Sequence, residues 1–188
     1  EAKCEGIKKA KLIHPEEIAS AISATIKEAE ETASLKINSA YVTIPGKYVT
    51  IVQNSITKET KDKYAGISTK DVSSAILQVK DIELPDDKIL IDILADKEYV
   101  KELSSIFKRA SIEIDGLVPV TLAERNLVLD TNELTDNVLL LDIGAGNTDI
   151  GVFEGSSFIY TNTILLGGNH ISNDISVLLN ISLEEAER

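Results

Sequence analysis

The sequence predicts an α/β protein whose first half has a looser, α+β organisation. Two observations lead to this class. In the second half, strand-like and helix-like segments alternate, and one apolar run ends at a glycine-rich turn that another strand-like run leaves at once. The first half has one long helix-like segment followed by short strand-like ones. The 188 residues suffice for one domain or two small ones. We place a boundary after residue 97, where the charge balance changes.

The first long helix is expected from Pro15 to about Ser34. Proline suits a first-turn position, and the two acids that follow it favour a helix N-terminus. Apolar and small side chains from Ile18 to Ala29 recur at helical spacing. This segment therefore has the strongest helical pattern of the chain.

The rest of the first half predicts short elements. Two strands, a helix and a further strand are expected at Ser39–Ile44, Tyr48–Val52, about Ser68–Val79 and Lys88–Leu94. Pro45-Gly46 separates the first two strands. Ser68, with Asp71 three residues later, resembles a capping box and so predicts the start of the helix.

The second half repeats a strand–helix rhythm. Helices are expected at Tyr99–Arg109, from Pro119 to about Leu129, and after Gly167-Gly168. Strands are expected at Ile112–Val118, Asn137–Ile143, Thr148–Phe153 and Ser157–Leu165. Ser182 and Glu185 form a capping box that opens a last helix near the end of the chain.

Charge argues against a nucleic-acid partner. The net charge is −12, and it is unevenly distributed: residues 1–97 hold 14 lysines and 16 acids, whereas residues 98–188 hold 5 basic and 15 acidic residues. Proteins that bind nucleic acids neutralise phosphates with basic patches, so the acidic second half does not fit that class. An acidic protein can still bind ATP, because a metal ion and backbone amides can hold the phosphates.

The cysteine content indicates the redox state of the compartment, and the methionine content indicates whether the sequence is part of a longer protein. The single cysteine, Cys4, excludes an intrachain disulfide and favours a reducing compartment. No signal peptide is evident, and no apolar run has the length of a membrane span. The chain begins at Glu1 and has no methionine, so we expect it to be part of something longer.

The most informative segment is the run from Leu139 to Phe153. An aspartate, Asp142, ends an apolar strand beside a turn whose glycines let the backbone approach a ligand. Several nucleotide-binding folds hold a phosphate and its metal ion in this way. A dinucleotide fingerprint needs a helix directly after its glycines. Because Thr148–Phe153 is β-branched and alternating, the turn instead predicts a β-hairpin.

Three stretches of the sequence also carry a resemblance to a known family: Cys4–Ile13 with the helix from Pro15, Ser39–Tyr48, and Leu140–Phe153 with Gly167–Ile175. Together they resemble FtsA, a family of bacterial cell-division proteins in the actin, sugar-kinase and heat-shock chaperone superfamily. The first two stretches resemble parts of an extra subdomain, called 1C, that is peculiar to FtsA. The third resembles the second phosphate-binding segment, which the whole superfamily shares.

The resemblance implies an incomplete actin-like ATPase-domain fold, of the ribonuclease-H-like type, with an inserted 1C-type subdomain. Residues 1–97 would form the 1C-like assembly subdomain and the strand leading into it, and residues 98–188 a partial actin-like core. A first phosphate loop, an adenosine-binding segment, the lobe that binds the tail of FtsZ and a C-terminal amphipathic membrane helix have no counterpart in this sequence. The chain is also shorter than the family pattern around Tyr99-Val100.

The same resemblance implies ATP and Mg²⁺ as ligands, with binding by this chain alone open to question. Asp142 would hold the hydration shell of Mg²⁺ and Asp149 would be a second acid, so these two are the candidate catalytic residues. Phosphate contacts would come from two segments, comprising Gly144, Ala145, Gly146, Asn147 and Thr148, and Gly167, Gly168 and Asn169.

Simpler interpretations of the same residues stay open. Glycines between two strands often serve only the turn, and an aspartate at a strand end is commonly a cap. His170 beside the glycines fits a helix cap or surface residue better than a ligand. Lys8, Lys9 and Lys11 fit a solvated face, because three lysines are few for a lipid site.

For function, the resemblance implies an ATP-binding, actin-like assembly protein that forms filaments and links the FtsZ ring to the membrane. Such a protein would be at most a slow ATPase. It would lie on the cytoplasmic face of the cell membrane at the division site, with FtsZ, other division proteins and further copies of itself as partners. Two alternatives are an ATPase or phosphotransferase of the sugar-kinase type and a nucleotide-independent interaction module.

Overall fold

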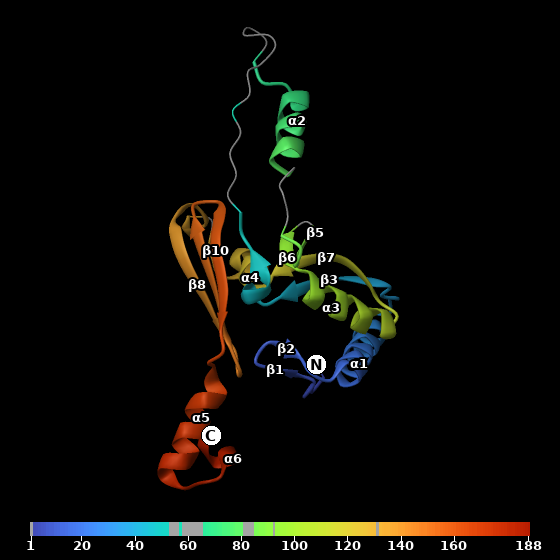
Figure 1. Ribbon diagram of the computed structural model, residues 1–188. Helices are drawn as coiled ribbons and strands as arrows, with labels where there is room; N and C mark the ends of the chain where they lie inside the picture. Colours follow the sequence, from blue (N-terminus) through green and yellow to red (C-terminus); the bar gives the residue numbers. More distant parts are fainter. Residues whose placement is uncertain (1, 53–56, 58–65, 81–84, 92, 131) are drawn as a thin grey trace.

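A computed structural model describes residues 2–52, 57, 66–80, 85–91, 93–130 and 132–188 (Figure 1). The described α-helices are α1 (Pro15–Ala33), α2 (Thr69–Lys80), α3 (Lys97–Arg109), α4 (Val120–Val128), α5 (Gly168–Leu179) and α6 (Leu183–Ala186). The 3-10 helices are η1 (Gly46–Tyr48) and η2 (Glu133–Thr135). The strands are β1 (Ile7–Lys8), β2 (Lys11–Leu12), β3 (Ser39–Ile44), β4 (Val49–Thr50), β5 (Lys88–Ile91), β6 (Ile93–Asp96), β7 (Glu113–Pro119), β8 (Asn137–Ile143), β9 (Thr148–Glu154) and β10 (Ser157–Ile164). The mixed α/β class predicted from the sequence is confirmed.

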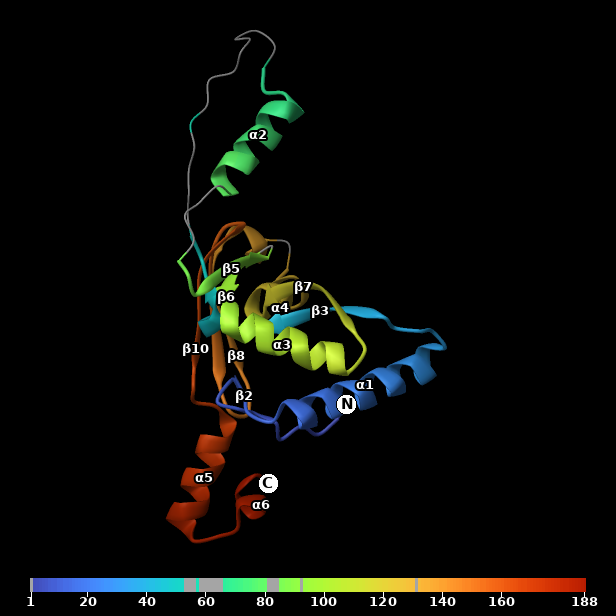
Figure 2. The same ribbon diagram turned by 45° about the vertical axis from the view of Figure 1, so that its right-hand side comes forward.

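The centre of the molecule is the parallel pair β3–β7, with α1 and α3 packed together beside it (Figure 2). Helix α3 buries Tyr99, Val100, Leu103 and Ile106, a helical spacing that places all four on one face. Ile44 at the end of β3 is fully buried in the same core cluster. Parallel strands bury both faces, which explains why helices cover this pair.

The residues of this core come from both sides of the predicted boundary at residue 97. Ile44 and Ala95 come from the first part and Leu103 and Leu117 from the second, yet they belong to one cluster of buried side chains. Strand β3 of the first part pairs with β7 of the second. The two predicted parts therefore share a core, and residues 1–97 do not pack as a separate body.

Two small sheets depart from the sequence prediction. Strands β1 and β2 form an antiparallel hairpin that we did not predict, because each strand has only 2 residues. The single strand predicted at Lys88–Leu94 is wrong: β5 and β6 pair antiparallel with each other over this region. Only 2 residues of the predicted strand Tyr48–Val52 form β4, and they pair with β6.

The sheet that carries the candidate site has the order β10–β9–β8, and all its pairs are antiparallel. Its inner face packs on α4, where Gly151 of β9 meets Thr121: a Cβ at Gly151 would lie 2.7 Å from the Thr121 Cβ. Phe153 is almost fully buried on this face. The outer face exposes large apolar side chains at Leu139, Leu141, Ile143, Tyr160 and Ile164.

Helices α2 and α5 extend away from the rest of the molecule in both views (Figures 1 and 2). None of the residues of α5 or α6 is buried. Helix α2 exposes Val72, Ile76 and Leu77. Within the described part of the chain, no helix combines the length and apolar character needed to cross a membrane.

Candidate functional site

The candidate site is built on the turn between β8 and β9. The amide of Gly144 donates to the carbonyl of Asn147 at 2.9 Å, which closes the turn, and β9 begins at Thr148. The hairpin prediction is confirmed, and so is the exclusion of a dinucleotide fingerprint, because a strand and not a helix follows the glycines.

The two predicted acids lie side by side but in different surroundings. Asp142 and Asp149 are cross-strand partners, so their side chains share one face of the sheet. Asp142 is half-buried, whereas Asp149 is only 3% exposed. Asp142 is therefore the more accessible of the two carboxylates.

The carboxylate of Asp149 is fully engaged within the protein. Its Oδ1 accepts hydrogen bonds from the amide of Gly46 at 2.9 Å and from the hydroxyl of Thr163 at 2.5 Å. Its Oδ2 accepts a hydrogen bond from Nδ2 of Asn147 at 2.7 Å. A buried carboxylate is stable only when its oxygens are paired in this way. Asp149 thereby joins the end of β3 to the sheet of the candidate site.

A third acid, Glu124 of α4, was missed by sequence reasoning because it has no motif around it. Burial, and then the charges of Asp142 and Asp149, raise the pKa of the Glu124 carboxyl above its usual range. The three carboxylates are therefore close enough to repel one another. Within the described residues, no group of three or more His, Cys, Asp or Glu side chains is arranged to hold a metal ion directly.

We expect Glu124→Gln to stabilise the protein at neutral pH. Because the pKa of Glu124 is raised in the folded state, this group costs no stability below the ordinary carboxyl pKa, and its cost grows as pH rises through the raised value. Chemical denaturation of the variant and wild type across pH measures the effect. The free energies of unfolding of the variant and the wild type should be equal at low pH and differ increasingly toward neutral pH. Equal stability at neutral pH, or a gain matched by the exposed-acid variant Glu113→Gln, would contradict the expectation.

The predicted phosphate-contact segments do meet in space. The amide of Gly168 donates to the carbonyl of Gly144 at 3.0 Å, and the amide of Asn169 donates to the carbonyl of Ala145 at 2.8 Å. The Thr148 hydroxyl donates to the carbonyl of Leu166 at 2.8 Å. These three groups thus hold the turn against the start of α5, and they are already occupied as donors.

Three amides of the turn remain for a ligand. Among the described residues, no hydrogen bond is found from the backbone N–H of Ala145, Gly146 or Asn147. A Cβ built on Gly146 would meet nothing within 4 Å, so the turn opens on free space there. Successive amides of a turn form an anion-binding concavity. With Asp142 beside them, these residues fit a phosphate and a hydrated Mg²⁺, which one carboxylate and waters can hold.

His170 takes a local role. Its Nδ1 lies 3.1 Å from the amide of Gly167, and it accepts that hydrogen bond at the start of α5. This geometry agrees with the cap interpretation of His170.

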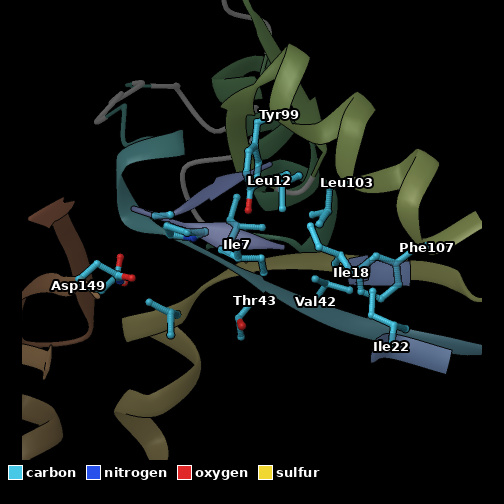
Figure 3. A pocket seen from close by; sticks show the side chains of 15 residues that line it. Ile7, Leu12, Ile18, Ile22, Val42, Thr43, Tyr99, Leu103, Phe107 and Asp149 are labelled. Atoms are coloured by element: carbon cyan, nitrogen blue, oxygen red, sulfur yellow. The ribbon is translucent and has the colours of Figure 1, made fainter. Parts of the chain in front are cut away.

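A cavity of about 310 Å³ lies next to the site (Figure 3). Asn147 and Asp149 line one end of it, and Figure 3 shows Asp149 set apart from the apolar side chains that line the rest. Those side chains come from the β1–β2 hairpin, α1, β3 and α3, and include Ile7, Leu12, Ile18, Val42, Leu103 and Phe107.

Comparisons with known proteins bear on the family. The family model "Cell division protein FtsA" matches residues 139–188, which run from β8 to the end of the chain. The FtsA of Bacillus subtilis (strain 168) is 26% identical over 215 aligned residues, covering 98% of this chain and 49% of that protein. The FtsA of Pseudomonas aeruginosa is 24% identical over 97% of this chain and 51% of that protein. The chain is similar to FtsA along nearly its whole length. It spans about half the length of these FtsA proteins.

Solved structures agree with the FtsA relationship at the level of the fold. The ethanolamine utilization protein EutJ from Carboxydothermus hydrogenoformans matches with a TM-score of 0.58 and 17% identity, over 97% of this chain and 48% of that one. MreB5 of Spiroplasma citri bound to ADP matches with a TM-score of 0.58 and 14% identity, over 97% and 42%. The actin-like fold predicted from the sequence is confirmed. The match covers less than half of either of these chains.

Proposed function

We propose that this FtsA relative is an actin-like protein of cell division that uses the β8–β9 turn as one side of an ATP site. The observation that carries the proposal is the set of turn amides at Ala145, Gly146 and Asn147, which lie beside Asp142 and have no protein acceptor among the described residues. The fold supports it further, since structures of MreB5 with ADP and with AMPPNP belong to proteins of similar fold.

In the proposed site, each residue of the chain has a defined task. The amides of Ala145, Gly146 and Asn147 donate to phosphate oxygens. Asp142 holds the water shell of Mg²⁺, and the ion neutralises phosphate charge beside the acids of the site. Gly168 and Asn169 contribute indirectly, because their amides fix the carbonyls of Gly144 and Ala145 and so the shape of the turn.

We propose that Asp149 positions the turn and does not react. All its hydrogen bonds go to protein groups, and its carboxylate is buried. A general base must reach the water that it activates. On this basis the protein is at most a slow ATPase, and its main role is assembly.

The ATP proposal is tested by thermal unfolding with and without Mg-ATP. A ligand at about 100 times its Kd adds about 2.7 kcal/mol of stability, and we expect a stabilisation of this kind in the wild type. Asp142→Asn should abolish the Mg²⁺-dependent part, because the neutral amide no longer attracts the hydrated ion. Asp174→Asn, an exposed acid on α5, is the control and should respond like the wild type. No stabilisation of the wild type, or equal stabilisation of Asp142→Asn, would overturn the proposal.

We further propose that the protein associates with copies of itself and with FtsZ at the cytoplasmic face of the membrane, as its relationship to FtsA suggests. Head-to-tail contacts of one chain with the next produce open filaments when the rotation does not close. Helix α2 is a suitable contact, since it stands apart and exposes the apolar side chains of Val72, Ile76 and Leu77.

We expect Ile76→Glu/Leu77→Glu to reduce self-association without changing ATP affinity. The charges would oppose burial of this helix face between copies. Light scattering measures assembly, and calorimetry measures ATP binding; Lys70→Glu on the same helix controls for added charge. Loss of ATP binding with assembly intact would contradict this division of roles.

A further inference from the structure

Four lysines gather near the candidate site, although the chain as a whole has a net charge of −12. Lys8 and Lys11 are cross-strand partners in the β1–β2 hairpin, and Lys9 lies in its turn with φ +50°. Lysines directly opposite each other repel and destabilise a hairpin. Within the described residues, no salt bridge includes Lys8, Lys9, Lys11 or Lys47. None of the four ammonium groups is therefore held in a close ion pair inside this part of the protein.

Lys47 of η1 connects this hairpin to the candidate site. Its Nζ donates to the carbonyl of Lys9 at 2.9 Å, while its backbone amide donates to the hydroxyl of Thr163, which also bonds Asp149. Burial, and then the charge of Lys11, lower the pKa of Lys47, and Asp149 opposes this shift. Lys47 is thus within electrostatic reach of Lys11 on one side and of the β9 acid on the other.

The lysine hairpin and the turn also border the same cavity. Ile7, Ala10 and Leu12 of the hairpin line it together with Asn147 and Asp149. Both ribbon views place β2 beside the end of β8 that leads into the turn (Figures 1 and 2). Ile7 and Leu12 are cross-strand partners that line the cavity, and Lys8 and Lys11 form the next cross-strand pair of the same hairpin.

The turn amides donate hydrogen bonds but carry no full charge, and the acids around them repel an anion. A triphosphate seated there needs cations in addition to one Mg²⁺. We propose that Lys47 and Lys11, supported by Lys8 and Lys9, form the cationic side of a polyphosphate site whose other side is the turn Ala145–Asn147. The proposal rests on the ATP-binding function proposed above and adds which residues receive the distal phosphates.

The test measures binding of Mg-ATP and of inorganic tripolyphosphate to the whole chain by calorimetry. The variant is Lys11→Gln/Lys47→Gln. Its control, Lys70→Gln/Lys108→Gln, removes the same charge from exposed residues on α2 and α3. We expect the variant to bind both probes about tenfold more weakly or worse, since each ammonium–phosphate contact is a charge-assisted hydrogen bond. The control should bind both probes like the wild type. A circular dichroism spectrum unchanged from the wild type confirms that the variant is folded.

The outcomes separate this inference from the proposed function. If the lysine variant binds ATP and tripolyphosphate as tightly as the wild type, the lysine site is wrong and the ATP proposal stands. If the wild type binds tripolyphosphate no more weakly than ATP and the variant loses both, the lysine site stands and nucleotide specificity is wrong. If the wild type binds neither probe, both are overturned. An equal loss in the control would also overturn the lysine site, because net charge alone would explain it.

Discussion

Asp149→Ala should destabilise the protein by about 3 kcal/mol, because it leaves buried donors without an acceptor. The amide of Gly46 and the hydroxyl of Thr163 both donate to Oδ1 of Asp149, in surroundings where the side chain is only 3% exposed. Water cannot easily replace the lost carboxylate there. Urea denaturation followed by circular dichroism measures the change.

Two further variants identify the cause of that effect. Asp149→Asn keeps one oxygen for Gly46 and Thr163 and should cost clearly less than the alanine variant. Asp115→Ala, at an exposed position of β7, should change stability by less than about 0.5 kcal/mol. If Asp149→Ala unfolds at the same urea concentration as Asp115→Ala, the carboxylate does not hold the β3 end against the sheet.

Gly167→Ala should separate α5 from the turn and abolish Mg-ATP binding. A Cβ at this position would overlap the carbonyl oxygen of Gly144 and lie 2.7 Å from that of Ala145. Both contacts are backbone, so they cannot move aside by a change of rotamer. The hydrogen bonds that the amides of Gly168 and Asn169 make to the turn would break with the shift. We expect a loss of about 1–3 kcal/mol in stability.

The neighbouring glycine provides the matched control for this steric argument. Gly146 lies in the same turn, its φ is not positive, and a Cβ there would meet nothing within 4 Å. Gly146→Ala should therefore keep wild-type stability. Denaturation and calorimetry on the two variants compare them directly. If both alanines are tolerated equally, the close packing of Gly167 on the turn does not determine the site.

The parts of the fold that could be predicted depend on neighbouring residues in the chain. Helix α1 has a proline at its start and apolar residues at helical spacing, and the prediction agrees with the structure to within one residue. The β8–β9 hairpin has alternating strands around a glycine turn, and both strands form where expected. Local backbone preference and periodicity suffice for such elements.

The parts that could not be predicted depend on contacts between distant residues. Asp149 has the same local sequence pattern as a ligand-binding acid. Its carboxylate, however, accepts a hydrogen bond from the amide of Gly46, 103 positions away in the chain. Glu124 joins the acids only because α4 packs on β8 and β9. The pairing of β3 with β7 across residue 97 is likewise invisible to periodicity, since neither strand carries a signal for its partner.

Amide NMR of the chain during titration with Mg-AMPPNP shows whether the amides of the β8–β9 turn hold phosphate. We expect large, saturable shifts of the amide signals of Ala145, Gly146 and Asn147, whose N–H groups have no acceptor among the described residues. The exposed strand residue Asp115 serves as a reference and should not shift. If the three turn signals stay fixed while the nucleotide binds, or if no signal moves at any concentration, the turn is not a phosphate site.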